Sequence, residues 1–237
     1  MRSFLIFGMF AASLAAAGEP DYSEVRELTE NASGASQFSI DTGAGSLSIE
    51  GVDGLDAIEV TATVGMDGVK DEEKAREIVE KNLELKLERR GDRVYLTTDF
   101  DHGLWGMGRE AWVKLEIRMP SALDLYVDDG SGSIQINNVR ASVKVDDGSG
   151  SIKIRGVGAL EIDDGSGSIQ VEDADGDVDI IDGSGSIRVT NVKGSVIVDD
   201  GSGSITVEDV TEDVRIEDAG SGSVNVANVA GSVETDG

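Results

Sequence analysis

The residues with the clearest capacity for chemistry are aspartates that recur before glycine at near-equal spacing. Six such sites follow one another, as four pairs and two single residues: Asp128-Asp129, Asp146-Asp147, Asp163-Asp164, Asp182, Asp199-Asp200 and Asp218. Carboxylates stacked about 5 Å apart repel by about 3 kcal/mol at an effective dielectric constant near 20. We interpret these columns as hydrogen-bonded, solvated turns, with Ca²⁺ binding as the alternative.

The strongest calcium candidate within this pattern is the segment 173–179, which contributes Asp173, Asp175 and Asp177 around Gly176. Its spacing is similar to the start of a calcium loop, but Ser184 stands where an EF-hand needs a bidentate glutamate. No metal or other cofactor is therefore expected, and Ca²⁺ at these three aspartates stays an alternative.

Catalytic machinery is not recognisable in the sequence. The chain has one histidine, His102, and no cysteine, so a zinc site lacks ligands and any Ser-His-Asp triad would have to use His102. No glycine-rich stretch ends in Lys-Ser or Lys-Thr, as a phosphate-binding loop would. The sequence predicts a protein that is not an enzyme and has no catalytic residues.

An apolar loop is the other candidate binding feature. Trp105 and Met107 lie among glycines in the segment 101–111. A tryptophan in such a loop is able to anchor a partner. The alternative is that Trp105 folds over one end of the domain as a lid, which we favour.

A repeat predicts the architecture that positions these residues. Gly-Ser-Gly-Ser recurs at intervals of 17–19 residues from Gly130 to Gly220, and 43–46 is a degenerate copy. Each unit contains two short alternating runs, such as Ile134 and Ile136, then Val143 and Val145. Two strands and two turns in about 18 residues indicate an all-β fold, a right-handed parallel β-solenoid with two strands per coil.

The turns of the repeat support the solenoid. Residues that tolerate left-handed backbone angles form one column: Asn138, Gly156, Asp173, Asn191, Asp209 and Asn228. The next column is apolar and should point inward: Val139, Val157, Ala174, Val192, Val210 and Val229.

Four segments follow from these patterns. Residues 1–17 read as a signal peptide with Arg2, a short apolar run and an Ala-x-Ala cleavage site, and 18–37 as an N-terminal linker. Residues 38–120 are expected to form irregular β-coils or a cap with a hairpin and one helix over about 71–82. The regular solenoid should occupy 121–237.

Charge restricts the partners. The formal net charge of −27 disfavours binding to nucleic acid and to anionic lipid. It favours binding to cationic peptides or to basic protein surfaces. No stretch reads as a transmembrane segment. We expect a mostly monomeric protein, exported to the periplasm, the cell surface or the medium, that binds an envelope or extracellular protein, a cationic peptide or a glycan.

The order of these motifs resembles the bacterial "putative adhesin" families of unknown function. The resemblance rests on Gly-x-Gly-Ser-Leu-x-Ile at 43–49, the hairpin 90–94, Met119-Pro120 and the Gly-Ser-Gly-Ser-Ile coils, and it covers about residues 38–237. It implies a right-handed β-helix and supplies no catalytic residues.

The sequence thus predicts a non-enzymatic exported scaffold or adhesin-like binding module with an acidic solenoid face. The first alternative is a calcium-dependent module that uses the stacked aspartates. A carbohydrate-active β-helix enzyme is a third hypothesis, disfavoured because the coils are short and aromatic residues are scarce after Tyr126.

Overall fold

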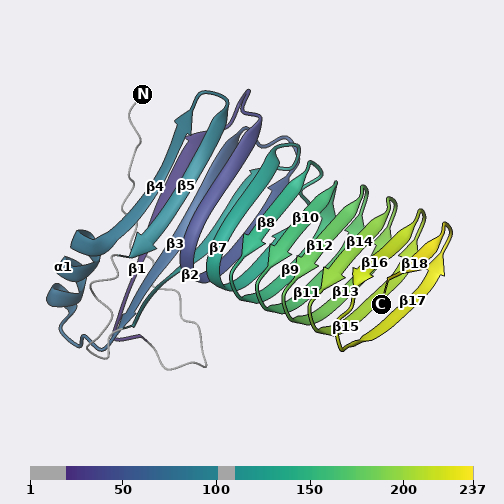
Figure 1. The fold of residues 1–237 in the computed structure, drawn as a ribbon. Helices are drawn as coiled ribbons and strands as arrows, with labels where there is room; N and C mark the ends of the chain where they lie inside the picture. Colours follow the sequence, from purple (N-terminus) through teal and green to yellow (C-terminus); the bar gives the residue numbers. More distant parts are fainter. Residues whose placement is uncertain (1–19, 101–109, 237) are drawn as a thin grey trace.

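The structure, a computed structural model, describes residues 20–100 and 110–236 and consists of two long rows of strands that face each other (Figure 1). The signal peptide predicted over 1–17 lies outside the described residues. The rows begin in a broad N-terminal half and continue into a series of short, regular coils. This all-β architecture with a parallel solenoid confirms the predicted fold class.

The N-terminal half contains longer strands and one helix of the described chain. Its elements are β1 (Tyr22–Asn31), β2 (Gln37–Val52), β3 (Ala57–Asp67), α1 (Glu72–Asn82), β4 (Leu83–Arg90), β5 (Arg93–Phe100) and β6 (Glu110–Pro120).

The solenoid alternates strands of five residues with strands of about eight. Its elements are β7 (Asp124–Asn137), β8 (Val143–Asp147), β9 (Gly150–Val157), β10 (Leu160–Asp164), β11 (Gly167–Ala174), β12 (Val178–Asp182), β13 (Gly185–Val192), β14 (Val196–Asp200), β15 (Gly203–Val210), β16 (Val214–Asp218), β17 (Ser223–Val229) and β18 (Val233–Thr235).

Each solenoid strand pairs in parallel with the equivalent strand one coil away. In the first row β8, β10, β12, β14, β16 and β18 follow one another, and in the second row β9, β11, β13, β15 and β17 do so. β7 bends around a turn and contributes to both rows. Because the register repeats, identical positions of successive coils stack into columns.

Alternation of side chains along the strands builds the core. Val143 and Val145 of β8, and Ile152 and Ile154 of β9, point inward and are fully buried, whereas Lys144 between the two valines is exposed. Isoleucine, valine and leucine columns therefore fill the space between the two rows, and their burial is the main stabilising contribution to the coils.

The turns after the longer strands follow the sequence prediction. Asn138, Asp173, Asn191, Asp209 and Asn228 all have φ between 57° and 60°. Gly156 fills the same position with φ 68°. The apolar column that follows is buried from Val139 to Val210, and Val229 in the last coil is partly buried.

β2 belongs structurally to the solenoid. Its two halves pair in parallel with the two halves of β7, and Gly45 lies opposite Gly132. The degenerate copy of the repeat at 43–46 is thus the coil next to the regular series. Beyond β2 the rows change character, because β3 pairs antiparallel with β6 and β4 antiparallel with β5.

The N-terminal half contains the predicted helix and also a strand that the sequence analysis did not predict. The predicted helix is present: the Asp71 side chain caps it by accepting the Lys74 amide at 3.0 Å, and Ala75 and Val79 are buried. The segment 18–37, expected as a linker, instead contains β1, which pairs antiparallel with β3. β1 is hard to recognise in the sequence because most of its residues are polar or charged. Tyr22 is the one side chain of this strand that is buried.

Candidate functional site

The paired aspartates form two stacked columns that face opposite ways. The first member of each of the four pairs points outward, and Asp41 of β2 stands in the same register. We call this set the outer Asp column: Asp41, Asp128, Asp146, Asp163 and Asp199. Ile181 interrupts this column between Asp163 and Asp199. Parallel neighbouring strands lie about 4.8 Å apart, so the uninterrupted carboxylates repeat at about that interval.

The outer Asp column is an unneutralised anionic stripe. Four of its members are exposed and Asp199 is half-buried. No ion pair joins the column to any lysine or arginine among the described residues. Partial burial, with the charges of Asp41 and Asp146, raises the pKa of Asp128.

The second member of each of the four pairs, together with the single Asp182, points into the solenoid. We call this set the inner Asp column: Asp129, Asp147, Asp164, Asp182 and Asp200. These side chains are at most 4% exposed and stack in register from coil to coil. Burial is the largest cause that raises their pKa, to about 7 for Asp129 and to about 6 for Asp164 and Asp182.

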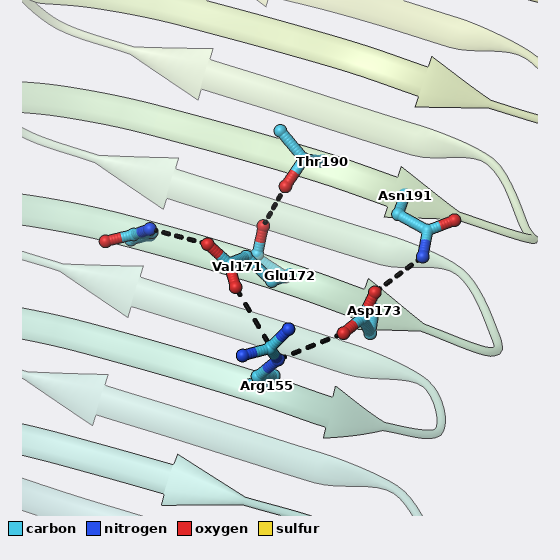
Figure 2. A network of polar contacts seen from close by, with 7 residues as sticks. Arg155, Val171, Glu172, Asp173, Thr190 and Asn191 are labelled. Carbon is cyan, nitrogen blue, oxygen red and sulfur yellow. Dashed lines mark hydrogen bonds and ion pairs between the residues drawn. The ribbon is translucent and has the colours of Figure 1, made fainter.

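Asp173, the first calcium candidate, lies in a polar network that joins three coils (Figure 2). Arg155 Nε donates to Asp173 Oδ2 at 3.0 Å, and Asn191 Nδ2 donates to Asp173 Oδ1 at 2.5 Å. These donors hold the pKa of Asp173 below its usual value. Both oxygens therefore already have partners in the neighbouring coils.

The other two calcium candidates also have protein partners. Lys193 Nζ lies 2.7 Å from Asp175 Oδ1, and the Ser195 amide donates to Asp177 Oδ1 at 2.9 Å. Within residues 20–100 and 110–236, no group of three or more Asp, Glu, His or Cys side chains is arranged to hold a metal ion. Calcium at Asp173, Asp175 and Asp177 stays a hypothesis.

The other candidate binding residues come from the segment 101–111. Trp105 and Met107, and also His102, lie outside the described residues. A pocket of about 330 Å³ opens where the N-terminal half meets the solenoid. Its lining consists of Gly43, Ala44, Thr98, Asp99, Phe100, Ala111, Val113, Gly130 and Ser131.

Sequence reasoning found the paired aspartates but missed that their two members face opposite ways. The signal was present in the alternation of β8, since Val143 and Val145 point inward and place Asp147 inward as well.

No helix among the described residues has the length and apolar character needed to cross a membrane.

Comparisons with known proteins give structural neighbours only. No family model matches the chain, and no curated protein matches it. A "putative lipid binding protein" from Parabacteroides distasonis has 16% identity and a TM-score of 0.46, with coverage of 93% of this chain and 98% of that chain. A "putative adhesin" from Bacteroides fragilis has 10% identity and a TM-score of 0.43, with coverage of 90% and 97%.

A third solved structure, a "putative cell adhesion protein" from Clostridium sporogenes, is 13% identical with a TM-score of 0.32 and covers 90% of this chain and 99% of its own. The adhesin descriptions agree with the family resemblance noted in the sequence. At this level of similarity the function has to be argued from the residues themselves.

Proposed function

We propose that this chain is a non-enzymatic, exported binding scaffold whose outer Asp column binds a cationic segment of an envelope or extracellular protein. The observation that supports this most directly is the lack of ion pairs between that column and the described residues. Elsewhere on the solenoid carboxylates do pair, as Glu161 does with Lys144 and Asp175 with Lys193. The outer Asp column keeps its charge available for a partner.

The scaffold fixes the spacing of these charges. Asp128, Asp146 and Asp163 stand on strands whose backbones are hydrogen-bonded in one register. A partner with lysine or arginine side chains would meet carboxylates already in place, so binding costs little ordering of the solenoid. A net charge of −27 adds long-range attraction that speeds encounter with a basic surface.

Binding of a labelled oligolysine peptide, followed by fluorescence anisotropy, tests this proposal. The triple variant Asp146→Asn, Asp163→Asn, Asp199→Asn should weaken binding by about tenfold at low salt, because each exposed ion pair contributes about 0.5 kcal/mol. Added salt should weaken binding by the unaltered protein, since exposed charges are screened.

A matched control removes three charges from α1 instead. Glu73, Glu77 and Glu80 are exposed there, so the triple glutamine variant has the same net charge as the solenoid variant. If both triples weaken the peptide equally, the peptide responds only to net charge and the outer Asp column is not the binding site.

A further inference from the structure

The inner Asp column buries five carboxyl groups that are only half satisfied. Asp147 Oδ1 accepts the Ser149 amide at 3.2 Å, and Asp164 Oδ1 accepts the Ser166 amide at 3.1 Å. Asp182 and Asp200 repeat this contact with the serine two residues later, at 3.0 Å in both cases. The sequence Asp-Gly-Ser thus closes four of the five turns with one carboxyl oxygen.

The second oxygen of each group has no such contact. Oδ2 of all five aspartates is buried and accepts no hydrogen bond from any residue that the structure describes. An ionised carboxylate would leave the negative charge on Oδ2 without a donor in a low-dielectric interior, which is costly. Each coil from Asp129 to Asp200 adds one more such carboxyl group and therefore the same free-energy cost again.

The charged surroundings make ionisation harder. Asp164 on β10 stacks between Asp147 of β8 and Asp182 of β12, and the outward Asp163 precedes it on its own strand. β11, which follows the turn, contributes the apolar Ile169 to the interior. At one end of the column Thr42 lies in register with Asp129, and near the other end the exposed Asp218, which a register shift places opposite Asp199, adds its negative charge to the surroundings of Asp200.

Within the described part of the chain, no lysine or arginine side chain forms an ion pair that would neutralise the inner Asp column. None of the ion pairs found there involves a member of the inner Asp column. A proton is the simplest remaining counter-charge, because it removes the negative charge and converts Oδ2 into a donor in a column where the next carboxyl group lies one coil away in register.

We propose that the inner Asp column carries protons that stacked carboxyl groups share, so that the solenoid is most stable under mildly acidic conditions and loosens as these protons leave. This device lies inside the coils and does not require a partner at the outer Asp column. It would give an exported scaffold a stability that reports the pH of its surroundings.

The direction and range of the effect follow from the titration of the column. Burial raises the pKa to about 7 for Asp129 and to about 6 for Asp164 and Asp182, and it also raises the pKa of Asp147 and Asp200. A carboxyl group whose pKa is higher in the folded state stabilises that state when protonated. The stabilisation is complete below about pH 4, the unfolded value, and is lost as the pH rises through 6 to 7.

Thermal unfolding of the full chain between pH 5 and pH 8 tests the proposal. Ordinary exposed carboxylates are already ionised throughout this range, so they contribute little to any change. The unfolding midpoint of the unaltered protein should fall by on the order of 10 °C from pH 5 to pH 8. A midpoint that is constant over this range would overturn the proposal.

Neighbouring residues provide a matched pair of variants. Asp164→Asn keeps the shape and the Oδ1 acceptor and adds a permanent donor, so it should raise the midpoint at pH 8 and flatten the pH dependence. Asp163→Asn removes the same charge from the outside and should change the pH dependence much less, because the Asp163 charge is a smaller cause of the raised pKa of Asp164 than burial. Equal pH dependence in the two variants would contradict proton storage in the column.

Two further measurements keep the proposal falsifiable if Asp164→Asn does not fold. Infrared spectra of the unaltered protein should retain a protonated-carboxyl band at pH 5.5 that disappears by pH 8, and its absence at pH 5.5 would contradict the proposal. A rise of the midpoint at pH 8 with Ca²⁺ but not with Mg²⁺, seen equally in the Asp175→Asn variant, would show that a metal ion satisfies Oδ2 instead, and would also overturn it.

Discussion

The N-terminal half and the solenoid continue the same two rows of strands, yet they treat one shared column of inward-facing polar residues differently. Before β7 this column consists of Thr98 of β5 and Thr42 of β2, which are buried and neutral. From β7 onward the same column consists of aspartates, beginning at Asp129, which lies in register with Thr42. Both regions are built to the same plan, but only the repeats stack one ionisable group on another.

The difference shows what a short repeat does to the energetics of a fold. In β1 to β6 each strand has its own sequence, so an unfavourable position occurs once. In the solenoid each favourable or unfavourable feature recurs in every coil, and stability is close to a sum of coil and neighbour terms. Changes at repeated positions should therefore reveal whether the two regions act as one unit or as two.

The largest effect is expected at the repeated glycines of the solenoid turns. Gly167 has φ of +154°, and a Cβ added to it would lie 1.6 Å from the Gly150 carbonyl oxygen of the preceding coil. Gly167→Ala should cost more than about 3 kcal/mol, because backbone strain adds to a collision that no side-chain movement relieves. Chemical denaturation, monitored by circular dichroism, measures this loss.

A turn in the N-terminal half provides the control. Gly91 has φ of +68°, and an added Cβ would meet no atom of the described residues within 4 Å. Gly91→Ala should cost about 1 kcal/mol, the usual penalty of a left-handed angle. Equal losses in the two variants would show that close packing of the coils is not what selects glycine at position 167.

An intermediate effect is expected from cavities in the two parts of the core. Ile169 stacks between Ile152 and Ile187 in the solenoid, and Leu96 is buried in the N-terminal half. Ile169→Ala and Leu96→Ala should each cost about 2–5 kcal/mol. Hydrogen exchange should locate the first loss in the coils around β11 and the second in β2 to β5. Loss of protection throughout the chain in both variants would show that the two regions unfold as a single unit.

The repeat explains how much of this fold could be read from the sequence. Periodicity of 17–19 residues, alternation within each unit and the Asn, Asp or Gly turn column determine the strands, their parallel pairing and the core. β1 was missed because a single edge strand without a repeated partner has only its own weak alternation, in which Glu24, Arg26 and Glu27 dominate.

The site was less accessible to sequence reasoning. Asp146 and Asp147 are identical residue types, and only strict alternation from Val143 distinguishes the outward carboxylate from the buried one. The partners of Asp173 and Asp175 stand about one coil away in sequence, at Arg155, Asn191 and Lys193. Their engagement could be inferred only after the register between coils was known.

The smallest effect is expected at an exposed ion pair of the solenoid, and it also tests calcium binding. Asp175 Oδ1 lies 2.7 Å from Lys193 Nζ, and both side chains are about two-thirds exposed. Asp175→Asn should leave the unfolding midpoint unchanged within error, as should Glu59→Gln in the N-terminal half, where Glu59 pairs with Arg118 at 2.6 Å.

If segment 173–179 held Ca²⁺, 1 mM Ca²⁺ would raise the midpoint of the unaltered protein well above the value in matched Mg²⁺, since a ligand that binds the native state stabilises it. Asp175→Asn would then lose that rise while Glu59→Gln kept it. Because Lys193, Ser195 and Asn191 already contact these carboxylates, we expect the two cations to act alike on all three proteins.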